Sequence, residues 1–225
     1  MGTKDYSCAD PELPLPTEFL IFGFRASIGA RTIVLGALMV MTGAGLLAEN
    51  KPAGLKGELL VARSRMRDPR FAETVILMIS HDKAGALGLI VNRPARKVDF
   101  GELMDPLEEP PPAETEQVTI HYGGPVALNQ VFVLHSTDVQ LEGSESVCEG
   151  VALSQAPEML GRIAKGKGPE HYLLIVGYSG WAPRQLEAEI ALGSWLIVKP
   201  SSSQVFAKEP SKMWKRIIDK HIIRL

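Results

Sequence analysis

The sequence predicts one domain that combines a β-sheet with helices, over residues 57–225, joined to a separate N-terminal extension. From residue 58 onward, short apolar runs rich in β-branched side chains alternate with turn signals, which is typical of a sheet. Helical spacing of apolar residues appears only between some of these runs and at the C-terminal end. The chain has 225 residues, 45% apolar and 22% charged, the composition of a globular domain with an appendage.

The predicted strands differ in how buried we expect them to be. Residues 74–80 and 86–92 are almost wholly apolar, so we expect central strands that are covered on both faces. Residues 82–85 between them have the length of a hairpin loop, and Pro94 ends the second strand. The expected strands are residues 58–62, 74–80, 86–92, 117–122, 130–135, 147–153, 171–178 and 195–198.

Four helices are expected, at residues 100–104, at 156–165 with Ser154 as N-cap, after Pro183, and at 211–223. In the third helix Leu186 and Ile190 are spaced to face the core, which leaves Glu187 and Glu189 pointing elsewhere. The inward residues of the second and fourth helices are Met159, Leu160, Ile163, Met213, Trp214, Ile217 and Ile218. Residues 105–116 hold four prolines and several carboxylates, which predicts an exposed acidic loop.

The extension, residues 1–56, contains the uncharged apolar segment 32–48. A signal peptide, a membrane anchor and a mis-assigned start site upstream of Met39 or Met41 each account for this segment. Lysines and arginines follow the segment closely, and this charge order disfavours export. We therefore expect a cytoplasmic protein, with membrane anchoring or export through segment 32–48 as the alternative.

Composition excludes several classes of site. The formal net charge of −2 gives no global attraction to nucleic acid. The two cysteines, Cys8 and Cys148, form no C-x-x-C pair, and Cys148 is expected to pack in a strand as a small apolar side chain. The five histidines show no spacing typical of metal ligands, so we predict no metal site and no cofactor.

Several strings occur in an order too specific to be compositional. They are Asp68-Pro69-Arg70-Phe71, Gly85-Ala86-Leu87-Gly88-Leu89-Ile90-Val91-Asn92-Arg93-Pro94, Gly123-Gly124-Pro125-Val126, Leu134-His135-Ser136, Gly177-Tyr178-Ser179-Gly180-Trp181, Gln185-Leu186-Glu187 and Gly193-Ser194-Trp195. With these strings, residues 57–214 resemble the AlgH/YqgE family of bacterial proteins.

The resemblance implies an α+β fold, with a mixed, largely antiparallel sheet and flanking helices in a single domain. The family is mostly uncharacterised, and one branch is described as a candidate transcriptional regulator of alginate production. The chain departs from the family pattern at Arg184, where the family usually has glycine. We expect the helix start to survive, because a first-turn helical position does not require glycine.

Ser179 follows a strand, which invites comparison with a G-x-S-x-G nucleophile elbow. The last position is Trp181 instead of glycine, and the partners would have to be Asp219 and His221 near the chain end. We expect Ser179 to satisfy a backbone group at the helix start instead. No catalytic residue is predicted.

Glycine turns beside arginines are the better lead. Gly123 and Gly124 could present backbone amides to an anion, and Arg70 and Arg93 lie in loops next to strands. Asp68 and Arg70 could equally pair to shape their own loop. The candidate binding residues are Arg70, Asn92, Arg93, Gly123, Gly124, Tyr178, Ser179, Trp181 and Gln185.

The sequence therefore predicts a regulatory protein, or a protein that binds a protein partner or a small anionic ligand, and the resemblance implies a candidate transcriptional regulator. The alternative is an enzyme that acts on a small anionic substrate at a pocket lined by glycine and arginine. Direct binding to nucleic acid is not expected, and membrane contact is expected only if segment 32–48 is a true anchor.

Overall fold

The computed structural model describes residues 54–100, 103 and 117–222. The extension with its segment 32–48 and the predicted acidic loop 105–116 lie outside the described residues. Of the predicted helix 100–104, only Phe100 and Leu103 are described, and both are buried. In the described part of the chain, no helix is long and apolar enough to cross a membrane.

Within the described residues, ten strands form two sheets that share one strand, β9. The first sheet has the order β10-β1-β2-β3-β9, and the second places β4, β5, β9, β6, β8 and β7 side by side. Of the nine strand pairings described, eight are antiparallel, and β5 with β9 is the parallel one. The strands are β1 (Leu59–Ala62), β2 (Val75–Asp82), β3 (Gly85–Ile90), β4 (Pro94–Asp99), β5 (Gln117–Tyr122), β6 (Val126–Ser136), β7 (Glu145–Cys148), β8 (Val151–Gln155), β9 (Tyr172–Trp181) and β10 (Trp195–Val198).

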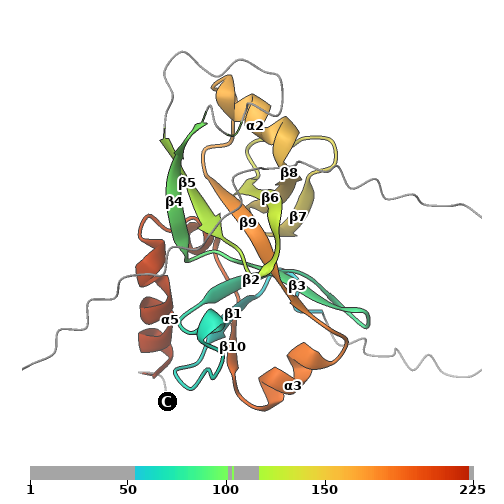
Figure 1. Cartoon of the computed structure of the whole chain (residues 1–225), viewed down its shortest axis with the longest axis vertical. Helices are drawn as coiled ribbons and strands as arrows, with labels where there is room; N and C mark the ends of the chain where they lie inside the picture. The colour runs from blue at the N-terminus through green and yellow to red at the C-terminus, as the bar shows by residue number, and fades with distance from the viewer. Residues whose placement is uncertain (1–53, 101–102, 104–116, 223–225) are drawn as a thin grey trace, which may run out of the picture.

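The shared strand β9 runs diagonally through the molecule in Figure 1 and connects the two sheets. Its first part pairs with β5 and β6, and its last three residues pair with β3. Gly177 lies at the change-over with φ 71°, a left-handed conformation that glycine adopts without steric cost. A Cβ there would lie 2.6 Å from the carbonyl oxygen of Gly124. The strand therefore bends at a position that needs glycine.

Alternation along the strands builds three apolar layers. Leu59 and Val61 of β1 point into the core between the sheets, whereas Leu60 and Ala62 point to the outer face of the first sheet. On β9, Ile175 faces the same inner core, and Leu174 faces the outer core of the second sheet. Because these strands are covered on both faces, their sequences are continuously apolar.

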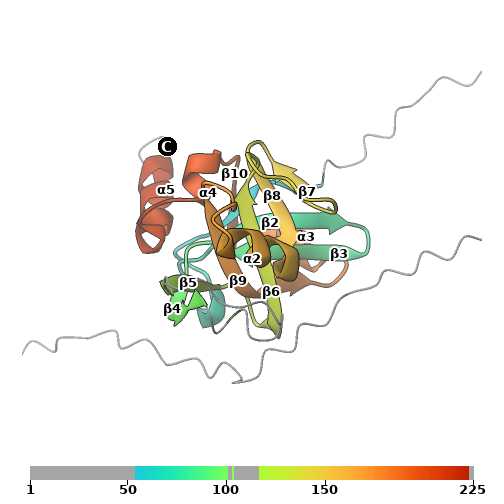
Figure 2. The same ribbon diagram turned by 90° about the horizontal axis from the view of Figure 1, so that it is seen from above.

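The helices close these layers. Helix α2 (Ala156–Ala164) covers the outer face of the second sheet, over β6 and β9 in Figure 2, and α3 (Gln185–Ala191) covers the first. Helix α5 (Met213–Ile222) lies beside the sheets and contributes Met213 and Ile217 to the inner core. The described part of the chain also contains two 3-10 turns, η1 (Pro69–Phe71) and η3 (Pro210–Lys212), and the short helix α4 (Ser202–Val205).

This architecture confirms the predicted α+β fold with a mixed, largely antiparallel sheet. Most expected elements form, with three differences. Pro94 follows one strand, as expected, but it also begins a further strand, β4, that was not predicted from the sequence. The single strand expected at 147–153 is two strands, turned at Gly150 with φ 74°. Ser154 is not an N-cap, since it lies in β8 with its hydroxyl 2.8 Å from His135 Nε2.

Candidate functional site

Three aromatic rings form a cluster on the outer face of the first sheet. Phe71 of η1 stacks on Trp181 at the end of β9, with ring centroids 6.4 Å apart. Trp195 at the start of β10 meets both rings edge-on, at 6.0 Å from Phe71 and 6.1 Å from Trp181. The cluster thus joins a loop and two strands that are far apart in the sequence, and α3 lies against it.

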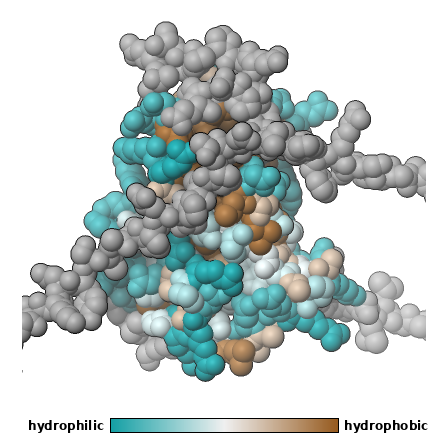
Figure 3. All heavy atoms as spheres, viewed as in Figure 1, coloured by the Kyte–Doolittle hydropathy of each residue, from teal (hydrophilic) through white to brown (hydrophobic). Residues whose placement is uncertain are grey.

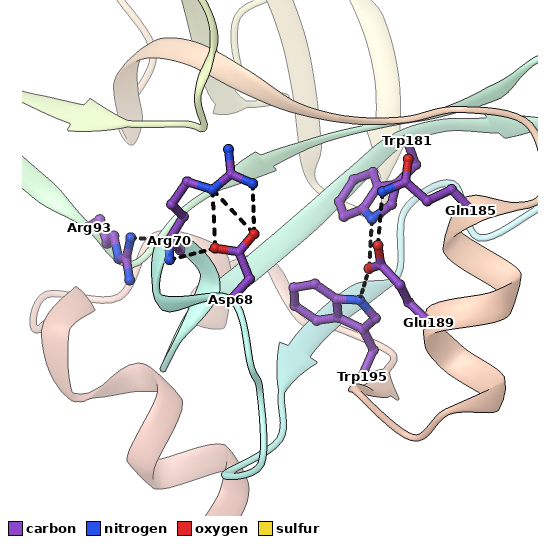
Figure 4. A network of polar contacts seen from close by, with 7 residues as sticks. All are labelled: Asp68, Arg70, Arg93, Trp181, Gln185, Glu189 and Trp195. Carbon is purple, nitrogen blue, oxygen red and sulfur yellow. Dashed lines mark hydrogen bonds and ion pairs between the residues drawn. The ribbon is translucent and has the colours of Figure 1, made fainter.

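Glu189 of α3 holds the two indoles in place (Figure 4). Its Oε2 accepts hydrogen bonds from Trp195 Nε1 at 2.8 Å and from Trp181 Nε1 at 3.0 Å. Its Oε1 accepts from Gln185 Nε2 at 3.0 Å. The expectation that Glu189 points away from the core was therefore wrong, although it held for Glu187, which is exposed and lies 3.2 Å from His81. The two indole hydrogen bonds fix α3 to the sheet, and the bond from Gln185 lies within α3.

The turn before α3 corrects the interpretation of Arg184. Gln185 N donates to Ala182 O at 3.0 Å, and Gln185 Oε1 accepts from Ala182 N at 3.1 Å, so residues 182–185 form a closed turn. Arg184 has φ 67° and ψ −3°, the third position of a type II turn, with Pro183 before it. This is a left-handed conformation and not a first-turn helical one. The helix survives, but at a position that favours glycine.

We expect Arg184→Gly to raise the free energy of unfolding by about 0.5–1 kcal/mol, because relief of the left-handed strain exceeds the added backbone entropy of the unfolded chain. Urea unfolding followed by tryptophan fluorescence measures this. Arg162→Gly, within helix α2, is the matched control and should lower stability by a similar amount. If Arg184→Gly were less stable than the parent, Arg184 would not be strained in its left-handed conformation.

Most arginine and asparagine candidates hold backbone in place. The Arg70 guanidinium pairs with both carboxylate oxygens of Asp68, with Nη2 at 2.7 Å from Oδ2, and lies 5.8 Å from the Phe71 ring centroid. This hydrogen-bonded pair lowers the pKa of Asp68. Arg93 donates to the carbonyls of Arg70 and Ala72 at 2.6 and 2.8 Å, which ties β4's start to η1.

Asn92 is buried and joins the beginning of β2 to the end of β3. Its Oδ1 accepts from Val75 N at 2.7 Å, and its Nδ2 donates to Glu73 O at 2.9 Å. Glu73 has φ 57°, so the amide fixes a strained residue. The position of Asn92 gives it a structural task that its motif did not reveal.

The glycine turn is packed against β9. Gly123 N donates to Val176 O at 2.8 Å, so this amide is not free to hold an anion. A Cβ on Gly124, which has φ 149°, would overlap the backbone of Tyr178 and Ser179. Ser179 is fully buried, and its hydroxyl donates to Gly123 O at 3.1 Å. It therefore satisfies a backbone group, as expected, but inside the sheet and not at the helix start.

Tyr178 and Trp181 line a shallow groove with a volume of about 480 Å³. The groove lies between the β2–β3 hairpin, the start of β6 and the end of β9. Its lining residues are Ser80, Asp82, Ala84, Gly85, Ala86, Leu87, Val126, Tyr178, Gly180 and Trp181. Arg70, Arg93, Gly123 and Gly124 are not among them, so the structure does not bring the arginines and the glycine turn together in this groove.

A second cavity, of about 420 Å³, lies on the other side of the fold, between β5, the start of β9 and the segment before α5. His121 lines it and is 5% exposed. Its Nδ1 has no hydrogen-bond partner among the described residues. Burial lowers the pKa of His121, and the backbone of Thr119 and Leu174 offsets this only in part. No group of three metal-ligating side chains exists in the described ranges.

This lowered pKa predicts a pH dependence of stability. The unfolded chain binds a proton at His121 at a higher pH than the folded chain does, so stability falls as pH drops below about 6.5. The urea midpoint should therefore change more between pH 7.5 and pH 5.5 in the parent than in His121→Phe. The variant keeps all the carboxylates of the parent, so the difference between the two proteins reports on His121. Equal pH dependence in the two proteins would contradict a buried neutral histidine.

Comparisons with known proteins agree with this fold. The family model described as AlgH-like, DUF179, matches residues 59–225. A UPF0301 protein of Methylococcus capsulatus is 39% identical over 166 residues, which cover 74% of this chain and 91% of the relative. A UPF0301 protein of Pseudomonas putida is 42% identical over 147 residues, 64% of this chain and 77% of the relative.

Two solved structures are similar. The solution structure of the AlgH protein from Pseudomonas aeruginosa has a TM-score of 0.64 at 32% identity and covers 81% of this chain and 93% of that one. A crystal structure of a protein from Corynebacterium diphtheriae has a TM-score of 0.58 at 22% identity over 73% of this chain and 85% of that one, which shows the fold alone. The chain belongs to the AlgH-like, UPF0301 family of bacterial proteins.

Proposed function

We propose that this protein is a non-catalytic binding protein that holds an extended segment of a partner protein in the groove between the β2–β3 hairpin and the end of β9. The observation that carries the proposal is the lining of this groove. Leu87, Val126 and Tyr178 give it apolar walls, and among the described residues Asp82 is the one charged side chain that lines it. Such a lining suits a segment with apolar side chains and a lysine or arginine.

An open strand edge supports an extended ligand. β8 pairs only with residues 132–136 of β6, so the half of β6 that begins at Val126 has no neighbouring strand on that side within the described residues. Free backbone groups of an edge strand can pair with an added strand. Val126 belongs to this edge and also lines the groove, so backbone pairing and side-chain contacts can act on one ligand.

The exposed apolar surface elsewhere is scattered. On the face shown in Figure 3, the hydrophobic residues that are visible form small areas among hydrophilic ones. The large apolar side chains that are exposed in the described part of the chain are Val126, Leu192 and Ile197, and of these Val126 lines the groove. A groove with an apolar wall is therefore the better docking surface.

The alternative, an enzyme acting on a small anionic substrate, has less support. No arginine of the described part of the chain lines either of the two cavities, and Ser179 is buried with its hydroxyl engaged. We propose that any regulatory role runs through the partner protein and not through DNA, in keeping with the net charge of −2. We further propose that the protein acts in the cytoplasm, because Lys51, Lys56 and the arginines that follow segment 32–48 disfavour export.

Selection from a random peptide library displayed on phage, with the full chain as bait, tests the proposal. We expect the selection to enrich peptides that contain apolar residues and a lysine or arginine. The substitution Val126→Asp should abolish the binding of these peptides. Ile197→Asp is the matched control, because Ile197 on β10 is 39% exposed and Val126 is 38% exposed. Retained binding to Val126→Asp, or equal loss in both variants, would refute the groove as the site.

A further inference from the structure

Leu192 is a large apolar side chain that the fold leaves outside. It is 76% exposed, caps the C-terminal end of α3 and belongs to none of the apolar clusters of the described residues. The backbone around it is held firmly, because Gly193 N donates to Ile190 O at 2.8 Å and Gly193 has φ 70°. Ser194 N donates to Glu189 O at 3.0 Å, which completes a Schellman motif. The leucine is therefore displayed on a rigid turn.

The loop between β1 and η1 lies against this turn and carries the exposed arginines Arg63, Arg65 and Arg67. Arg65 Nε donates to Gly193 O at 3.3 Å, and Arg63 N donates to Ser194 O at 2.9 Å. None of the three arginines forms an ion pair with a described residue. Leu192 thus has cationic side chains beside it.

Carboxylates of the described residues do not neutralise these arginines. Residues 63–74 contain four arginines and two carboxylates, Asp68 and Glu73. Asp68 is paired with Arg70 through both of its oxygens. Glu189, on the adjoining helix α3, is engaged by the two indoles. The loop therefore keeps an excess of positive charge at its surface.

The α3–β10 turn and the β1–η1 loop form the lower end of the molecule in Figure 1. Figure 3 shows a hydrophobic area at this end, beside hydrophilic residues. The linings of the two cavities described above include neither Leu192 nor any of the three arginines. A protruding end without walls does not enclose a peptide, but it fits a flat surface.

We propose that this end, the basic tip formed by Arg63, Arg65, Arg67 and Leu192, binds to the surface of an anionic membrane. Leu192 enters the boundary between the headgroups and the acyl chains, and the arginines pair with the anionic headgroups. The binding is weak and reversible, because one apolar side chain gives less than the single acyl chain that is itself a marginal anchor. The basic tip shares no residue with the groove or with segment 32–48, so this contact is independent of both.

Hydrogen–deuterium exchange of the full chain, measured by mass spectrometry, tests the proposal. The probes are vesicles of phosphatidylcholine alone and vesicles with about one third phosphatidylserine. We expect the anionic vesicles to slow exchange in residues 63–67 and 191–194, with half of the effect at about millimolar lipid and loss of the effect at high salt. Because exchange is localised along the chain, contact of segment 32–48 with the bilayer neither hides nor imitates this result.

Variants of the full chain separate the two parts of the basic tip. Leu192→Gln should raise the lipid concentration for half-protection about threefold or more, because it removes the apolar side chain without a change of charge. Val126→Gln is the matched control, since Val126 is also exposed, at 38%, but lies in the groove. This control should protect residues 63–67 as the parent does.

The double variant Arg63→Gln/Arg67→Gln should raise the same lipid concentration about tenfold. Lys199→Gln/Lys208→Gln, which removes two exposed lysines outside the basic tip, should change it less than about twofold. The proposal is overturned if about 10 mM anionic lipid gives no protection, if uncharged vesicles protect equally, or if the folded tip variants behave as the parent. Protection by poly-glutamate but not by vesicles would overturn it in favour of an acidic protein partner.

Discussion

Glu189→Ala should lower the free energy of unfolding by about 2–4 kcal/mol, because it removes the acceptor of three hydrogen bonds and leaves two buried indole N–H groups unsatisfied. Trp181 is 6% and Trp195 3% exposed, so water cannot replace the lost carboxylate without opening the aromatic cluster. Urea unfolding measures the loss, and a red-shifted emission of the folded variant should accompany it.

Glu187→Ala is the matched control on the same helix. Glu187 is exposed and has a single described partner side chain, His81, at 3.2 Å, so its removal should leave the urea midpoint nearly unchanged. If Glu189→Ala proved as mild as this control, the carboxylate would not be what fixes α3 to the sheet.

Gly124→Ala should be more disruptive still, with a loss of about 3 kcal/mol or more, or no folded product. The added methyl group would overlap the backbone of Tyr178 and Ser179, and backbone in the centre of two sheets cannot move aside as a flexible side chain can. The measurement is the yield of soluble protein and the urea midpoint.

Gly143→Ala separates steric overlap from conformational strain. Gly143 also has a positive φ, 87°, but a Cβ there meets no atom within 4 Å. We expect a loss of only about 1–2 kcal/mol from the left-handed conformation. Equal losses at positions 124 and 143 would mean that close packing of the glycine turn on β9 is not important.

Local sequence signals were sufficient for much of the sheet. β10 has the predicted bounds, 195–198, because its four residues are all apolar, and β1 differs by one residue, because a strand covered on both faces leaves an uninterrupted apolar run. β4 was missed because it is a polar edge strand with one buried residue, Val98. The turn at Gly150 was missed because apolar residues on both sides concealed it.

The candidate site was harder to predict because long-range contacts decide the role of each side chain. The motifs identified Asn92, Arg93 and Ser179, but no local pattern shows that their partners are backbone groups of residues 70–75 and 123. Glu189 was misplaced because helical spacing from Leu186 and Ile190 ignores the two indoles that approach from β9 and β10. The spacing of Gln185 and Glu189 on one face was the available signal.

We infer a division of tasks among the motif residues: Asn92 holds the scaffold together, and Val126 belongs to the groove that binds the partner. Dissociation constants for a selected peptide, measured beside urea midpoints for Asn92→Ala and Val126→Asp, test it most directly. We expect Asn92→Ala to lower the urea midpoint but to bind the peptide within about twofold of the parent, and Val126→Asp to keep the midpoint but lose binding. Loss of binding in folded Asn92→Ala, with binding retained in Val126→Asp, would contradict it.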